Sequence, residues 1–388
     1  MRWFRMVGTG TASLVLLTGA VVSSAGDAGA STTTGPLHAV FSTFDSSNTS
    51  MISCPPGGTG ASTTCYLVGA GPGGTPPPGQ QAYPGIPSDF SYEVVPVTNG
   101  QVGPPVLLPS GDEAVSIVCP SGPTCVAVGR TGVNSGAFFW IDYGKVTKTL
   151  AVPEASYWYD LACGKDLNCV GVGENYVKRG SQTLEYGMLA SEVGGSLSEH
   201  VFTSTSQFDA VACPSASQCV AAGASYSPDY KTHGVLVDLT NGQPGPVRQV
   251  AGTSLLTHLA CGWEQGVCLA NGTAPGTSGG ILPAQVTIEG SETTVSVLPA
   301  TDSGASLICP MVGRCLEFGV ANANTRQEHG FVATVTGGKA NPPVTVSNTA
   351  DIYGLSCPVA GSCVGLASYL HGAHGDFSEA TFTLSYSS

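Results

Sequence analysis

Basic side chains are scarce in this sequence, which has 13 Lys and Arg against 26 Asp and Glu and a formal net charge of −13 over 388 residues. Binding to nucleic acid or to an anionic lipid surface needs clustered Lys and Arg that displace counterions. The shortage therefore excludes nucleic acid as an expected partner. Charged residues of both signs make up only 10% of the chain, whereas glycine alone contributes 53 residues. This composition disfavours long helices and favours short strands joined by turns.

Long apolar runs are also missing after residue 30. Before that point, Arg2 and Arg5 precede the apolar stretch "ASLVLLTGAVV" and the small-residue stretch "SSAGDAGA". This order is typical of a secretory signal peptide, and the apolar stretch is shorter than the roughly 20 residues that a membrane-spanning helix needs. We therefore expect residues 1–30 to be a signal peptide, 31–36 a short linker and 37–388 the folded domain. The sequence predicts a secreted, extracellular protein without membrane insertion.

An unpaired cysteine is the third absence. All fourteen cysteines fall into consecutive pairs along the chain: Cys54 and Cys65, Cys119 and Cys125, Cys163 and Cys169, Cys213 and Cys219, Cys261 and Cys268, Cys309 and Cys315, Cys357 and Cys363. Zinc ribbons also use cysteine pairs, but their partners usually lie roughly two to four residues apart and four ligands hold each ion, so seven pairs would leave one stranded. An exported protein meets an oxidising compartment, which favours disulfides. We expect seven disulfides and no metal site.

The cysteine pairs recur with a nearly constant period. From the second pair to the seventh, the first cysteines are spaced 44, 50, 48, 48 and 48 residues apart. Periods of this size indicate solenoids, propellers or arrays. Each unit offers four strand candidates and no helix, as the fourth unit shows with "DAVAC", "QCVAAGAS", "HGVLVDLT" and "PVRQVAG". The last two are joined by the hairpin turn signal Asn241-Gly242, and the same place is taken in other units by Asn99-Gly100, Gly194-Gly195 and Gly337-Gly338. The repeat predicts an all-β, seven-bladed β-propeller with four antiparallel strands and one disulfide per blade.

The two ends of the repeat array complement each other. After Cys363 only two strand candidates remain, "CVGLASY" and "EATFTLSY", so the last blade lacks its outermost strand. A spare candidate, "LHAVFSTF" from Leu37 to Phe44, precedes the first blade. A propeller protects its sheet edges by closing into a ring, whereas a linear solenoid needs polar capping repeats. We therefore expect the N-terminal strand to join the last blade and to close the ring.

The repeated units also support a family resemblance. The stretches "CPSASQCVAAG" and "CPSGPTCVAVG" resemble the cysteine-clamped repeats of secreted actinobacterial β-propeller proteins. The resemblance covers residues 37 to 388 and implies the propeller fold and export, and it brings no catalytic residue with it. The aspartate-box turn of sialidases, Ser-x-Asp-x-Gly-x-x-Trp, does not occur in the sequence.

The order of strands in a blade assigns the loops to two faces. The cysteine-clamped loops and the Asn-Gly turns lie on one face, the clamp face. The loops between the second and third strands and the loops that lead into each innermost strand lie on the other, the variable-loop face, which carries most of the length variation. Acidic and aromatic residues gather where the innermost strands begin: Asp112, Glu113, Tyr157, Trp158, Tyr159, Asp160, Phe208, Asp209, His258, Asp302, Asp351 and Tyr353. Such groups suit a cation or a stacked sugar, and turn carboxylates with packing aromatics are the structural alternative.

The expected binding residues are drawn from this set: Tyr157, Trp158, Tyr159, Asp160, Asp209, His258 and Tyr353. The run "SYWYD" at 156–160 is the densest aromatic cluster in the chain. The leading hypothesis is a monomeric, non-catalytic binding or scaffold protein without a cofactor, which engages a glycan, a cell-wall component or a protein partner through the variable-loop face. The alternative is a carbohydrate-active enzyme, a lyase or glycosidase, with Asp160 and Asp209 as paired carboxylates from adjacent blades.

Three further features fit both a functional and a structural explanation. Arg130, Arg179 and Arg326 lie in variable-face loops and could clamp a carboxylate, but they belong to different blades, so we expect solvated charges. The tract "HGAHGD" at 371–376 resembles a metal site, but a residue followed by glycine opens the third strand of other units as well. The proline- and glycine-rich insertion at 71–90 suits a lid, a partner-binding arm or a plain surface loop.

Overall fold

The computed structural model describes residues 40–385, with gaps at 45–47, 58–62, 73–89, 99–100, 110–111, 132–134, 227–230, 263–265, 277–279, 299–304, 312–313, 322–327, 337–338 and 372–375. These residues belong to the compact unit Gly35–Ser388. The expected signal peptide, the linker, Leu37 and most of the insertion at 71–90 lie outside the described residues. Within the described part, the chain contains no helix long and apolar enough to cross a membrane.

The strands form seven separate sheets, which we number as blades in chain order. Blade 1 contains β2 (Asn48–Ser53), β3 (Thr64–Pro72), β4 (Phe90–Thr98), β5 (Gln101–Val102) and β6 (Val106–Leu107). Blade 2 contains β7 (Asp112–Ser121), β8 (Thr124–Thr131), β9 (Ser135–Asp142) and β10 (Lys145–Val152). Blade 3 contains β11 (Tyr157–Cys163), β12 (Cys169–Arg179), β13 (Gln182–Val193) and β14 (Ser196–Phe202). Blade 4 contains β15 (Gln207–Ala212), β16 (Gln218–Tyr226), β17 (Thr232–Thr240), β18 (Gln243–Pro244) and β19 (Arg248–Gln249).

The remaining three sheets follow the same plan. Blade 5 contains β20 (Leu255–Cys261), β21 (Val267–Pro275), β22 (Ile281–Glu289) and β23 (Glu292–Val297). Blade 6 contains β24 (Ser306–Met311), β25 (Arg314–Ala321), β26 (His329–Thr336), β27 (Lys339–Ala340) and β28 (Val344–Thr345). Blade 7 contains β29 (Thr349–Val359), β30 (Ser362–His371), β31 (Asp376–Ser385) and the N-terminal β1 (Val40–Phe44). The seven-bladed, all-β propeller predicted from the repeat is confirmed.

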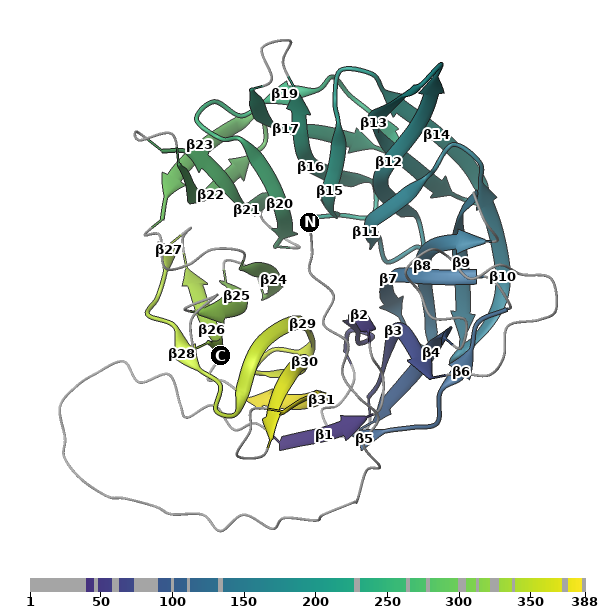
Figure 1. Cartoon of the computed structure of the whole chain (residues 1–388), viewed down its shortest axis with the longest axis vertical. Coiled ribbons are helices and arrows are strands. Elements are labelled where there is room, and N and C mark those ends of the chain that lie inside the picture. Colours follow the sequence, from purple (N-terminus) through teal and green to yellow (C-terminus); the bar gives the residue numbers. More distant parts are fainter. Residues whose placement is uncertain are drawn as a thin grey trace. The chain divides into compact units, whose positions relative to one another are not determined.

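The blades follow one another around a closed ring (Figure 1). The innermost strands β2, β7, β11, β15, β20, β24 and β29 contact each other in this order, and β29 in turn contacts β2. Closure is completed by β1, which pairs antiparallel with β31 from Val40 opposite Thr383 to Phe44 opposite Glu379. The N-terminal strand therefore supplies the outermost strand of blade 7, as the sequence predicted.

Seven disulfides, one per blade, join the end of each innermost strand to the start of the second strand. The paired Cα atoms lie 3.9 to 4.1 Å apart, so each bridge links directly opposed residues of a hairpin. The pairing is the one predicted from the sequence. In the chain-entropy model, a bridge that closes so short a loop stabilises the fold by about 2 kcal/mol. Each bridge also fixes the register of its hairpin.

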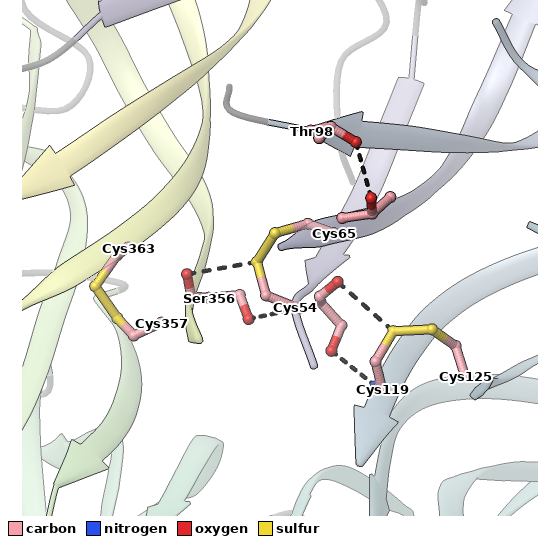
Figure 2. The surroundings of a disulfide bond; sticks show 10 residues. Cys54, Cys65, Thr98, Cys119, Cys125, Ser356, Cys357 and Cys363 are labelled. Atoms are coloured by element: carbon pink, nitrogen blue, oxygen red, sulfur yellow. Dashed lines mark hydrogen bonds between the residues drawn. A yellow bond between two sulfur atoms is a disulfide. The ribbon is translucent and has the colours of Figure 1, made fainter. Parts of the chain in front are cut away.

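Blade 1 is joined to both of its neighbours through serine hydroxyls (Figure 2). The backbone N–H of Cys54 donates to Ser356 Oγ of blade 7 at 2.9 Å, and the N–H of Cys119 in blade 2 donates to Ser53 Oγ at 2.9 Å. These bonds satisfy backbone groups where the strand ladders end. Hydrogen bonds to serine side chains therefore join blade 1 to blade 7 and blade 2 to blade 1.

A recurring bulge explains the glycine that ends the repeated "CVAxG" stretch. In six of the seven innermost strands the register shifts by one residue in the first half of the strand, as between Trp158 and Asp160 in β11. An added Cβ would overlap the carbonyl oxygen of the bulged strand at each of the facing glycines: Gly129, Gly173, Gly223 and Gly272. The side chain is excluded because the two backbones approach too closely there.

The outermost strands differ from the sequence prediction. In blades 1, 4 and 6 the outermost strand is divided into two short segments rather than one. In blade 4, β18 lies in the stretch that the sequence assigned to the turn, and β19 covers only part of the predicted strand "PVRQVAG"; Pro244 and Pro246 lie between or at the ends of these segments and donate no ladder hydrogen bond. The predicted hairpin turns are confirmed at Asn241-Gly242, with φ of 51° and 75°, and at Gly194-Gly195, with φ of 59° and 88°.

The hydrophobic core is divided among the seams between blades. The cluster between blades 2 and 3, for example, joins Val126 and Phe138 to Trp158 and Leu161. Equivalent clusters of buried residues lie at the other seams. Because both faces of each blade are buried against neighbours, the strand ends and loops are left to carry function.

Candidate functional site

Five residues of blades 3 and 4 gather on the variable-loop face, and we call them the tyrosine–carboxylate cluster: Tyr157, Tyr159, Glu174, Tyr176 and Asp209. The rings of Tyr157 and Tyr159 contact edge to face with centroids 5.1 Å apart. The Tyr159 hydroxyl donates a short hydrogen bond to Glu174 Oε1. Three elements supply these side chains, namely the start of β11, the far part of β12 and the bulge in β15.

The Glu174 carboxylate is the centre of the cluster. Glu174 is only 3% exposed, and its Oε2 atom has no hydrogen-bond partner among the described residues. Burial, followed by the hydrogen bond to Glu174, raises the pKa of Tyr159 well above its ordinary value. The Tyr159 phenol therefore keeps its proton and acts as a hydrogen-bond donor rather than as a phenolate nucleophile.

Asp209 presents a second carboxylate oxygen without a donor. Its Oδ1 atom accepts from Gln207 Nε2 at 2.7 Å, whereas its buried Oδ2 atom has no partner among the described residues. Burial raises the pKa of Asp209 to about 7, with a further rise from Glu174 and an opposing effect of Gln207. A buried carboxylate without enough donors is destabilising, so a ligand that donates hydrogen bonds to it would be favoured.

An ion pair extends the cluster toward blade 2. Arg130 on β8 pairs with Glu113 on β7, and its guanidinium lies 5.8 Å from the centre of the Tyr157 ring. The expectation of a solvated charge is therefore wrong for Arg130, because the facing Glu113 holds it in the strand ladder. Arg179 is exposed at the tip of the β12–β13 hairpin, and Arg326 lies outside the described residues.

Two tyrosines of the variable-loop face are exposed, one of them in the cluster. Tyr176 is 45% exposed, and Tyr226 in blade 4 is 58% exposed. Both are the seventh residue after the second cysteine of their blade, so the repeat places them at equivalent positions on the variable-loop face. Exposed rings of this kind can stack on the apolar faces of sugar rings.

Asp160 serves as a link between three blades. Its Oδ1 atom accepts from Leu161 N at 2.8 Å and from Ser116 Oγ of blade 2 at 3.4 Å, and its Oδ2 atom accepts from Val211 N of blade 4 at 2.9 Å. Burial raises its pKa to about 6, and the three donors oppose that rise. Because both oxygens are engaged by neighbouring strands, Asp160 is poorly placed to act as a nucleophile or a general base.

Trp158 is a core residue, which corrects its expected place in a contact surface. It is 1% exposed and packs edge to face against Phe138 of blade 2 with centroids 5.7 Å apart. Its ring covers Gly171, where an added Cβ would lie 2.7 Å from the ring. Strand alternation turns Trp158 into the seam while its two neighbours Tyr157 and Tyr159 lie toward the loops.

The other predicted binding residues are not brought into the cluster. His258 lies in blade 5 with its Nδ1 atom 3.0 Å from Thr257 Oγ1, and burial lowers its pKa to about 4, so the ring is neutral at neutral pH. Tyr353 of blade 7 packs against the apolar cluster shared with blade 1. Of the wider set of residues at the strand starts, Phe208 is fully buried and Asp302 lies outside the described residues, as does His374 of the tract "HGAHGD".

Sequence reasoning missed Glu174 and Tyr176. Glu174 directly follows the "CVGVG" stretch and Tyr176 comes two residues later, where the second strand leaves the repeated pattern. The signal was a carboxylate at a position that is alanine, threonine, valine or serine in most other units.

Comparison with known proteins shows the fold alone. No family model and no curated protein matches the chain. Among solved structures, the chain is similar to hydrazine synthase of Kuenenia stuttgartiensis, with a TM-score of 0.56 and 11% identity over 87% of this chain and 96% of that one. It is also similar to the β-propeller domain of Cps50 (Swd1) from Myceliophteria thermophila, with a TM-score of 0.52 and 10% identity over 90% and 99% of the two chains. A third similar structure is the β-propeller domain of the Trilobed protease from Pyrococcus furiosus, with a TM-score of 0.50 and 11% identity over 87% and 96%. At this identity the likeness establishes a β-propeller and no activity.

Proposed function

We propose that the protein is a secreted, non-catalytic binding protein that takes a carbohydrate ligand on the variable-loop face over blades 3 and 4. Seven disulfides suit an oxidising, extracellular environment, and the resemblance of the repeats to secreted propeller proteins agrees with export. The observation that carries the proposal is that two buried carboxylate oxygens, Glu174 Oε2 and Asp209 Oδ2, have no hydrogen-bond partner among the described residues and that the exposed Tyr176 belongs to the same cluster.

Carbohydrates match this set of groups. Their hydroxyls donate hydrogen bonds to carboxylates, and their C–H faces stack on aromatic rings. Tyr176 lies at the edge of the cluster, and burial and then Glu174 raise its pKa above the ordinary value, so it remains a neutral phenol. A ligand reaches the buried oxygens when the exposed Tyr176 side chain turns aside and its ring stacks on the sugar.

A glycan array probed with the purified protein tests the proposal, and isothermal titration calorimetry on the strongest hit gives the affinity. We expect Tyr176→Ala and Glu174→Gln each to weaken binding about tenfold or more, because each removes stacking or a charge-assisted acceptor. The matched control is Tyr143→Ala. Tyr143 is 77% exposed but lies in the β9–β10 turn on the clamp face. Equal losses in the control and in Tyr176→Ala, or no glycan binding at all, would refute the proposal.

The glycosidase alternative keeps one supporting observation, the Asp209 carboxyl, whose pKa of about 7 suits a general acid. Its proposed partner, Asp160, has both oxygens engaged by donors from other strands, Ser116 Oγ and Val211 N. Incubating the bound glycan with the protein and analysing it for cleavage distinguishes the two functions. Cleavage that is lost in Asp209→Asn would support the enzyme, and an intact glycan supports binding alone.

A further inference from the structure

The exposed tyrosines Tyr176 and Tyr226 occupy equivalent places in adjacent blades. Glu174 of blade 3 lies opposite the first residue of β11, and Tyr176 follows it by two residues. Ala224 of blade 4 lies opposite the first residue of β15, and Tyr226 follows it by two residues. In the other blades, the seventh residue after the second cysteine is not aromatic: Pro72, Gly132, Pro275, Asn322 and Leu370. The fold therefore does not require a ring at this place.

Each of these tyrosines lies at the seam that follows its own blade. Alternate residues of a strand share one face, so Tyr176 lies on the same face of β12 as Val172, which packs in the cluster shared with blade 4. Tyr226 lies on the same face of β16 as Ala222, which packs in the cluster shared with blade 5. Tyr176 therefore belongs to the seam between blades 3 and 4, and Tyr226 belongs to the next seam along the ring.

The two seams offer different groups to a ligand. Tyr176 shares its cluster with Glu174 and Asp209, each of which has a buried carboxylate oxygen with no hydrogen-bond partner among the described residues. At the place equivalent to Glu174, blade 4 has the small, buried Ala224. The first seam can therefore accept hydrogen bonds from sugar hydroxyls, whereas the exposed ring of Tyr226 at the second seam is suited to stacking.

The charge of this region disfavours acidic sugars. The whole chain has a formal net charge of −13, and the arginine that contacts the cluster, Arg130, is paired with Glu113. Like charges that are brought together at an interface weaken binding. A sugar with its own carboxylate or sulfate would meet the Glu174 and Asp209 carboxylates, so an uncharged sugar fits this site better.

We propose that the ligand of the variable-loop face is an uncharged, linear oligosaccharide that lies across two successive seams. One sugar stacks on Tyr176 beside the two carboxylates, and a sugar further along the chain stacks on Tyr226. Packed sheets lie about 10 Å apart, so a chain of several sugars is needed to reach both rings. This inference rests on the proposed glycan binding and adds to it the length and charge class of the ligand.

Isothermal titration calorimetry at pH 8 with three series of oligosaccharides, from the disaccharide to the hexasaccharide, tests this proposal. The series are β-1,4-linked glucose, β-1,4-linked N-acetylglucosamine and α-1,4-linked glucose. In the series that binds best, we expect affinity to rise about tenfold or more from the disaccharide to the hexasaccharide, because the second stacked sugar is already tethered to the first. Oligogalacturonides of the same length, which carry a carboxylate on each sugar, should bind at least about tenfold more weakly.

Variants of Tyr226 separate the second seam from the first. Tyr226→Ala should weaken binding of the hexasaccharide about fivefold or more and leave binding of the disaccharide unchanged, because the disaccharide occupies only the first seam. Tyr226→Phe, which keeps the ring, should bind both as the natural protein does, and this separates lost stacking from lost folding. Tyr143→Ala on the clamp face is the matched control and should change neither affinity.

The failure of this inference differs from the failure of glycan binding itself. Equal affinities for the disaccharide and the hexasaccharide, both lost in Tyr176→Ala, would overturn the two-seam site and leave the glycan-binding function in place. Equal or tighter binding of the oligogalacturonides, or a glycan array that selects only branched or acidic glycans, would overturn it in the same way. A protein that binds no glycan would overturn both proposals.

Discussion

The substitution Asp209→Asn tests whether the buried charge of Asp209 destabilises the folded protein. The Asp209 carboxyl has a pKa of about 7 in the folded protein against an ordinary 3.8, because burial penalises its charged form. Because folding raises this pKa, the protonated Asp209 side chain stabilises the folded protein fully below the ordinary pKa of 3.8. This contribution is lost as the pH rises through about 7. A difference of about three in pKa corresponds to about 4 kcal/mol.

Asparagine keeps the shape and the acceptor for Gln207 but carries no charge. Asp209→Asn should therefore match the natural protein at pH 4 and exceed its free energy of unfolding by about 4 kcal/mol at pH 8. With an unfolding entropy of about 2.1 cal/mol/K per residue over roughly 350 residues, this difference corresponds to about 5 °C in Tm. Differential scanning calorimetry at pH 4, 6 and 8 measures it.

The control is Asp238→Asn in the same blade. The Asp238 side chain is 50% exposed and pairs with Arg248 at the surface, so its loss should cost about 1 kcal/mol or less. A Tm of Asp209→Asn at pH 8 equal to or below that of the natural protein would refute the reasoning. So would the same pH dependence in both proteins, since it would show that Asp209 is not the strained group.

Three further predictions concern the scaffold. Gly173→Ala should lower the free energy of unfolding by about 3 kcal/mol or more, because the added Cβ would overlap Tyr157 O. The control Gly180→Ala, at a φ of 63° with nothing within 4 Å of the added Cβ, should cost about 1 kcal/mol. Similar Tm values for the two variants would contradict the bulge explanation. Reduction of all seven disulfides should lower Tm by about 10 °C or more, and an unchanged melting curve with reductant would show that the bridges do not stabilise the fold. Deletion of residues 40–44 should expose the edge of β31 and cause self-association, seen by light scattering, and a monodisperse, equally stable product would argue against closure by β1.

The fold was predictable from the sequence because the features that specify it are local and repeated. The cysteine pairs mark the inner hairpin of every blade, and the deficit of strands after Cys363 matches the spare strand that ends at Phe44. The glycine of the "CVAxG" stretch was visible in the sequence, but its cause was not. It depends on a bulge in the opposite strand, which strand periodicity does not reveal.

The candidate site was predictable only in part. The sequence identified the "SYWYD" stretch, and the structure places Tyr157 and Tyr159 of this stretch in the cluster. The sequence did not identify Trp158 as a core residue, because deciding which face of the strand is buried requires the position of the neighbouring blade. Glu174 and the pairing of Arg130 with Glu113 were missed for the same reason, since these contacts join residues that lie 15 and 17 positions apart on different strands.

The buried pair Asn271 and Glu317, which is hydrogen-bonded between blades 5 and 6, could have been found without a structure. Aligning the seven units on their second cysteine makes Asn271 and Glu317 stand out as polar residues at positions that are otherwise apolar. What the alignment does not give is the cavity beside them, which depends on how two blades pack.

The binding site over blades 3 and 4 is tested most directly by NMR on protein with ¹³C-labelled tyrosine rings, titrated with the glycan that binds best on the array. The chain has 13 tyrosines, so the ring signals can be assigned one by one with Tyr→Phe variants. We predict that the signals of Tyr157, Tyr159 and Tyr176 shift as the glycan saturates the protein and that the signal of Tyr143 stays in place. Shifts confined to Tyr143, or a saturating glycan that leaves all three cluster signals unmoved, would contradict the account.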